Sequence, residues 1–125
     1  MASSNVSLKS PKSYRLALKV IFNIMKKWQV DEKKQRILLG NPATDVFETW
    51  KCGEVTSLEN DVLERISYMM GIYKNLGTLF PEQRQANEWL HKPNTAFGES
   101  SALDFLLIGL VVNLREVRHY LDAQF

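Results

Sequence analysis

Apolar residues recur every three to four positions along most of the chain, the spacing of a buried helix face. One such stretch runs from Ser13 to Trp28, and the longest runs from Leu58 to Phe80. Shorter stretches follow the same spacing at 31–39, 42–51, 81–90, 101–107 and 113–121. Strand-like alternation never lasts more than four positions. The pattern therefore predicts an all-α protein of at most seven helices, with a long central helix connecting its two halves.

Polar residues and glycines at the ends of these stretches predict the helix boundaries. Side-chain oxygens that can accept a backbone N–H favour the start of a helix, and a glycine favours its end. Gly40 and the Cys52-Gly53 pair are the expected stops for the second and third helices. The expected starts are Ser13, Asp31, Asn41 followed by Pro42, Thr56 with Glu59, Pro81, Ser101 with Asp104, and Asn113 with Glu116.

Two short helices separated by a turn that contains Gly40 have the outline of a helix-turn-helix. In that reading Thr44–Lys51 is the recognition helix. The same outline describes many short helix pairs in all-α proteins. We expect a flexible tail at 1–12, a helix-turn-helix-like DNA-binding part at 13–57, the connecting helix at 58–80 and a C-terminal part at 81–125. The candidate DNA-binding residues are Lys33, Lys34, Arg36, Thr44, Thr49 and Lys51.

Charge is distributed unevenly along the chain. Residues 1–40 carry nine Lys or Arg against Asp31 and Glu32, a net charge of +7. Residues 41–125 carry seven basic against twelve acidic residues, a net charge of −5. Such asymmetry indicates that the first part faces a polyanion such as DNA. A solvated basic helix face is the alternative. Asp45 and Glu48 in the third helix oppose phosphate contact there.

Neither a catalytic constellation nor a cofactor motif is present in the sequence. The six glycines are dispersed, so no phosphate-binding loop is predicted. One cysteine, Cys52, and two distant histidines, His91 and His119, give no metal-ligand spacing. The N-terminus lacks the apolar core of a signal peptide, and the longest apolar run, Phe105–Val112, is far too short to span a membrane. We expect a cytoplasmic, non-enzymatic protein without metal or cofactor and without membrane association.

The stretch Ala86–Leu107, ANEWLHKPNTAFGESSALDFLL, is more elaborate than a connector between helices requires. It follows LENDVLERISYMMGIYKNLGTLFP at Leu58–Pro81 and precedes VRHYLDA at Val117–Ala123. Together these segments resemble the Xre/MbcA/ParS antitoxins, the partners of RES-domain toxins in bacterial type II toxin–antitoxin pairs. The resemblance covers residues 31–125.

The resemblance implies that the C-terminal half is a toxin-binding domain that covers the active site of an NAD-consuming RES toxin. It also implies that the N-terminal half binds operator DNA and represses its own operon, and that the protein is a homodimer. A stand-alone helix-turn-helix regulator without a toxin, or a structural binding module, are the alternatives. The residues that match or adjoin the family's toxin-binding segments are Trp89, Pro93, Asn94, Phe97, Gly98, Arg115, Arg118, Tyr120 and Phe125.

Some of these positions have a structural interpretation as well as a functional one. Trp89, like Leu103 and Leu121, fits a core position as well as an interface. Arg115 and Arg118 are expected to have no internal partner, which makes them the clearer toxin-contact candidates. Phe125, at the end of the sequence, fits either a partner pocket or its own domain.

Overall fold

The computed structural model describes residues 10–125, and these residues form only helices, turns and one isolated bridge. The fold class predicted from the sequence is therefore confirmed. Within this range no helix is both long enough and apolar enough to cross a membrane. The elements are α2 Pro11–Lys27, α3 Glu32–Leu38, α4 Thr44–Lys51, α5 Asn60–Leu79, α6 Gln83–His91, the 3-10 turn η1 Thr95–Phe97, α7 Ala102–Leu106 and α8 Val111–Asp122.

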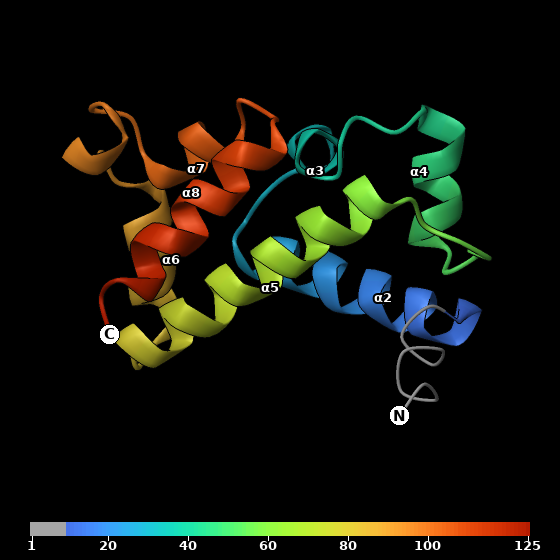
Figure 1. Cartoon of the computed structure of the whole chain (residues 1–125), viewed down its shortest axis with the longest axis horizontal. Helices are drawn as coiled ribbons and strands as arrows, with labels where there is room; N and C mark the ends of the chain where they lie inside the picture. Colours follow the sequence, from blue (N-terminus) through green and yellow to red (C-terminus); the bar gives the residue numbers. More distant parts are fainter. Residues whose placement is uncertain (1–9) are drawn as a thin grey trace.

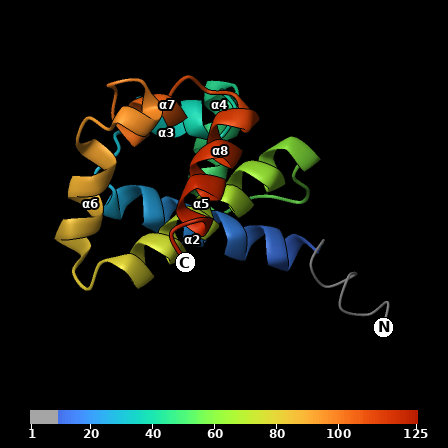
Figure 2. The same ribbon diagram turned by 60° about the vertical axis from the view of Figure 1, so that its left-hand side comes forward.

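The long helix α5 is the scaffold of the molecule. Helix α8 lies along α5, and α2 crosses it (Figures 1 and 2). At about 1.5 Å per residue, its 20 residues span roughly 30 Å, enough to touch both halves of the chain. A single core results, since burying apolar faces against one shared helix is the main stabilising contribution. Its fully buried side chains include Leu18, Ile21 and Met25 from α2 with its C-cap residue Trp28, Met69, Ile72 and Leu76 from α5, and Leu114, Val117 and Leu121 from α8.

Three of the predicted helix boundaries are confirmed, two by a capping hydrogen bond and one by its backbone conformation. Asp31 accepts from the backbone N–H of Lys34 at 2.9 Å and caps α3. Ser101 accepts from the N–H of Asp104 at 3.0 Å and caps α7. Helix α3 is followed by Gly40 with a φ of 95°, a left-handed conformation that glycine adopts without a steric penalty.

Helices α2 and α4 start at other residues than the sequence predicted. Helix α2 starts at Pro11, so residues 11 and 12 are not part of a tail, and the cap is Ser10 rather than Ser13. Residues 1–9 lie outside the described part. Asn41 does not cap α4, because its own φ of 57° places it in the turn after Gly40. Ala43 precedes α4 without a side-chain cap, and the helix starts at Thr44.

The starts of α5, α6 and α8 also differ from the prediction. Helix α5 begins at Asn60 without a capping hydrogen bond from Thr56 or Glu59. The capping box lies instead at the start of α6, where Glu82 and Gln85 satisfy each other's backbone N–H groups, rather than at Pro81. Helix α8 begins at Val111, and Asn113 is a buried residue inside it. A sequence pattern for a cap therefore does not oblige the chain to use it.

Side chains from the second half of the chain hold the helix ends of the first half. The Asn87 amide donates to the Lys27 carbonyl at 2.8 Å, and His91 Nε2 lies 2.9 Å from the Trp28 carbonyl. Both carbonyls belong to the last turn or cap of α2, where no intrahelical donor remains. The buried Arg65 extends to the Leu38 carbonyl at the end of α3, at 3.4 Å. The two halves are thus one packed unit.

Candidate functional site

The loop between α6 and α7 is built by the polar residues of the distinctive sequence motif. Pro93 and Ser101 form an antiparallel bridge, and the Asn94 N–H donates to the Ser100 carbonyl at 2.9 Å. The Asn94 side chain accepts from the N–H of Ala96 at 2.9 Å and starts η1. Gly98 ends that turn with a φ of 66°, in the left-handed region. The motif therefore encodes a closed loop of defined shape.

Four aromatic rings attach this loop to its neighbouring helices. Phe97 is buried, and its ring centroid lies 5.2 Å from that of Phe105 and 5.3 Å from that of Tyr120. The Trp89 ring is 6.2 Å from both Phe97 and Tyr120, edge-on to the first and stacked on the second. These separations are those of favourable aromatic pairs. Trp89, Phe97, Phe105 and Tyr120 thus hold α6, η1, α7 and α8 together, and we refer to these four rings as the aromatic cluster.

Arg118 has an internal structural role, contrary to the expectation that it lacks an internal partner. Its guanidinium lies on α5 over Gly71, where an added Cβ would come within 1.9 Å of Nη1. Its Nε donates to Asp122 at 3.2 Å, and Asn75 of α5 donates to the same carboxylate at 2.7 Å. The absence of a side chain at Gly71 makes this close approach possible.

The carboxylate of Asp122 is the centre of this contact between α5 and α8. Its hydrogen bond from Asn75, and then that from Arg118, lower the pKa of the carboxyl below its ordinary value of 3.8. Hydrogen bonds to the charged form favour that form. The carboxylate therefore stabilises the folded state at neutral pH, and this contribution is lost as the pH falls below 3.8 through the lowered pKa.

Arg115 and Phe125 are exposed, unlike the rings of the aromatic cluster and the Arg118 guanidinium. No described side chain forms an ion pair or hydrogen bond with Arg115. The Phe125 side chain is 65% exposed. Arg115 lies one turn after Val112 on the same face of α8, and Val112 is 41% exposed. Pro93 and Gly98 are exposed at the loop surface.

An exposed apolar surface lies between α7 and α8 and was not predicted from the sequence. Ile108 is 62% exposed and Leu110 is 58% exposed, on either side of Gly109. With Val112 and Arg115 they form what we call the α7–α8 surface. Apolar side chains grouped at a surface often mark a protein contact. The sequence signal for this surface was Gly109, a helix-breaking glycine inside an apolar run. It interrupts the helix, so that Ile108 and Leu110 do not belong to a buried helix face.

The candidate DNA-binding residues are only partly available for contact. Lys33 and Lys34 are exposed on α3, and Thr44 is exposed at the start of α4. Arg36 donates to the Pro42 carbonyl at 2.9 Å, and the Thr49 hydroxyl donates to the Asp45 carbonyl at 2.8 Å. These two side chains therefore stabilise the turn and the helix that carry them.

Lys51, at the end of α4, is bound to two carboxylates. It donates to Glu32 and Glu48, and the hydrogen bond to Glu32 is the main cause of its raised pKa. The ion pair with Glu32 joins the end of α4 to the start of α3. Of the candidate cations, only the side chains of Lys33 and Lys34 make no hydrogen bond or ion pair among the described residues.

The fold and the loop together define an all-helical protein with a motif-built C-terminal loop. Residues 75–125 match the antitoxin Xre/MbcA/ParS C-terminal toxin-binding domain. The chain is also similar to the uncharacterized protein y4oB of Sinorhizobium fredii (strain NBRC 101917 / NGR234). The two are 40% identical over 107 residues, which cover 86% of this chain and 82% of that protein.

The chain therefore belongs to the Xre/MbcA/ParS family of antitoxins. Its α6, the loop, α7, α8 and the end of α5 constitute the matched domain. That family membership supports an antitoxin role with a toxin as partner. The resemblance inferred from Ala86–Leu107 and Val117–Ala123 is confirmed.

Proposed function

We propose that this antitoxin binds and occludes a RES-type toxin that consumes NAD, and that it uses the C-terminal half to do so. The observation that carries the proposal is the exposed, unpaired Arg115, one helical turn after the exposed Val112, in a segment that also exposes Ile108 and Leu110 inside the matched domain. A cation beside apolar groups is a typical centre of a protein interface. The protein inhibits by covering the toxin, without chemistry of its own.

In this proposal the other motif residues hold the binding surface in place. The aromatic cluster and the Asn94 cap fix the loop, so the exposed Pro93 and Gly98 are presented without loss of conformational freedom on binding. Preorganisation of this kind raises affinity because less ordering is required at the moment of association. Phe125 is a further candidate contact because most of its side chain is in solvent.

The direct test uses the purified antitoxin and the protein encoded by the adjacent reading frame. If that protein is a RES toxin, we expect the two to co-purify and the antitoxin to stop NAD consumption at near-stoichiometric concentration. An enzymatic cycling assay, in which the rate of absorbance change is proportional to the NAD that remains, measures NAD consumption. A stable complex without inhibition would contradict occlusion, and the absence of any complex would favour a stand-alone helix-turn-helix regulator.

We also propose that the N-terminal half binds operator DNA and that a homodimer does so. Exposed Lys33 and Lys34 on α3, together with the net charge of +7 over residues 1–40, support contact with phosphates. The acidic Asp45 and Glu48 are exposed on α4, which argues for contacts centred on α3 rather than insertion of α4. Repression of its own operon would follow from such binding.

The salt dependence of binding tests the DNA contact. We expect the affinity for a duplex from the protein's own promoter to fall steeply with salt, because each neutralised phosphate releases counterions. Replacing Lys33 and Lys34 by alanine should lower the slope of log K against log [salt] by about two. The matched control is Lys74→Ala with Lys92→Ala, two exposed lysines of the other half. A flat salt response, or an equal loss in the control, would rule out this contact.

A further inference from the structure

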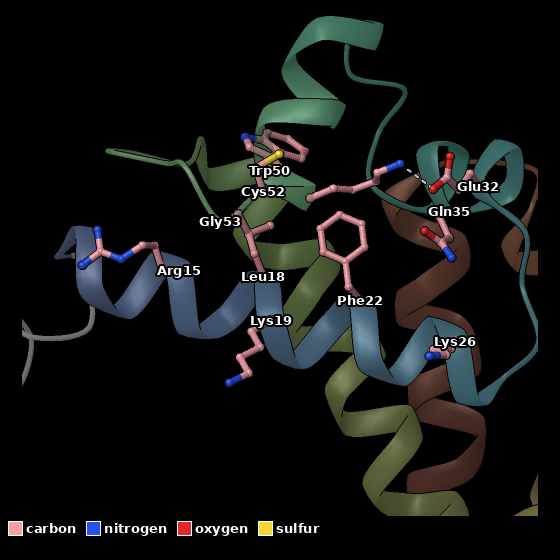
Figure 3. Close-up of a pocket in the computed structure, with 11 residues that line it drawn as sticks. Arg15, Leu18, Lys19, Phe22, Lys26, Glu32, Gln35, Trp50, Cys52 and Gly53 are labelled. Atoms are coloured by element: carbon pink, nitrogen blue, oxygen red, sulfur yellow. Dashed lines mark hydrogen bonds and ion pairs between the residues drawn. The ribbon is translucent and has the colours of Figure 1, made fainter.

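A cavity of about 530 Å³ lies between α2, the start of α3 and the end of α4. In Figure 3, Leu18 and Phe22 extend from α2 toward Trp50 and Cys52, which close the opposite side. Phe22 is fixed there by an edge-on contact with Phe47, at 5.7 Å between ring centroids. The volume falls within the range of small-molecule sites, roughly 300–1,000 Å³. The cavity is thus a mainly apolar recess, large enough for a ring system.

Basic side chains surround this recess. Arg15, Lys19 and Lys26 are spaced by four and seven residues, so they share one face of α2 with Leu18 and Phe22. Lys19 and Lys26 extend outward at the rim in Figure 3. Their flexible stems allow the ammonium groups to reach a ligand in the mouth of the cavity.

The rim cations are not neutralised within the protein. None of Arg15, Lys19 and Lys26 forms an ion pair with a described residue. Glu32 is the single acid in the part of the lining that the structure describes, and its carboxylate is bound by Lys51. Three cations without an ion-pair partner therefore line a recess whose one carboxylate already has a partner. An anion placed here would gain their attraction while its apolar body covers Phe22 and Trp50.

We propose that this cavity binds a small anionic ligand with an aromatic or similarly flat apolar body, such as an aromatic carboxylate or sulfonate. Duplex DNA does not fit this description, because a rigid helix cannot enter a recess and its phosphates gain nothing from an apolar floor. The proposal is independent of the toxin interface, which lies in the other half of the chain. It also differs from the DNA contact in its residues, because Lys33 and Lys34, the proposed phosphate contacts, do not line this cavity.

The chain provides its own reporter for occupancy. Cys52 is the only cysteine, it is exposed and it lines the cavity. A ligand in the recess should therefore slow alkylation of Cys52 by iodoacetamide, a small neutral reagent. Trp50 is part of the same lining, so a change in its share of the fluorescence of the three tryptophans gives a second signal.

The test uses 1-anilinonaphthalene-8-sulfonate as the probe and the full chain. We expect saturable binding with one probe per chain and a rate of Cys52 alkylation that falls at least about fivefold at saturation. Lys19→Glu with Lys26→Glu should weaken binding about tenfold, since repulsion replaces attraction at the rim. The neutral analogue N-phenyl-1-naphthylamine should bind about tenfold more weakly than the sulfonate for the same reason.

The matched control is Lys74→Glu with Lys92→Glu, which changes the net charge equally at exposed sites of the other half. Binding should change less than about twofold in this variant, because neither lysine lines the cavity and interactions between exposed charges are screened by salt. Thermal unfolding of both variants verifies that each is folded. The proposal is overturned if the probe does not saturate, if Cys52 is not protected, or if both charge variants weaken binding equally.

Discussion

Replacing Phe97 with alanine should lower the free energy of unfolding by about 3 kcal/mol, the usual cost of deleting a buried phenylalanine ring. Phe97 is 8% exposed and contacts the rings of Trp89, Phe105 and Tyr120. Its loss removes apolar burial and leaves a space that these rings cannot fully close. For a chain of this length the melting temperature should fall by about 10 °C. Urea or thermal unfolding followed by circular dichroism measures both quantities.

Phe125→Ala is the matched control for this prediction. It deletes the same ring from a side chain that is 65% exposed and outside the aromatic cluster. The expected change is within about 0.5 kcal/mol, as for most surface substitutions. If Phe97→Ala and Phe125→Ala had equal effects, the aromatic cluster would not be what holds the loop to its helices.

Arg115→Glu should weaken binding of the proposed toxin at least about tenfold and restore NAD consumption at antitoxin concentrations where the wild type blocks it. The exposed guanidinium has no partner among the described residues, so its reversal leaves the fold intact and acts at the interface. Reversing a charge at a complementary contact replaces attraction with repulsion, and such pairs contribute several kcal/mol when desolvated. Titration of toxin activity and isothermal calorimetry give the two readouts.

Arg84→Glu is the control, since it makes the same change at an exposed site of α6. Arg84 pairs only with the exposed carboxylates of Glu82 and Glu88, so little stability depends on it. Inhibition should remain within about twofold of the wild type. Unchanged inhibition by Arg115→Glu, or equal loss in Arg84→Glu, would argue against the α7–α8 surface as the toxin contact. Arg118→Glu is a less clean test because Arg118 also packs on Gly71.

Local rules predicted the parts of the fold that depend on neighbouring residues. The helical spacing of apolar residues gave the all-α class, and Asp31, Gly40 and Ser101 marked helix ends that the structure has. Each of these signals acts over three or four residues, the reach of one helical turn. Where capping patterns competed with tertiary packing, as at Thr56 and Asn113, the pattern was not used.

The sequence predicted which segment forms the candidate site, but only some of the roles of its side chains. The segment around Pro93, Asn94 and Gly98 was identified as a shaped loop, because turn-forming residues carry that information locally. Which of the neighbouring motif residues would be buried and which exposed could not be predicted. Trp89, Phe97 and Tyr120 lie on different elements, and their contacts exist only when those elements pack.

The sequence by itself determined the helical class, the motif of the loop and the family to which the chain belongs. The tertiary structure alone decided that Arg118 lies on Gly71 while Arg115 remains exposed, although the two arginines are three residues apart. It also decided that Asn87 and His91 cap α2 from positions 60 and 63 residues away. Local propensities act within a turn of helix, whereas the partner of a side chain is set by which distant faces are buried together.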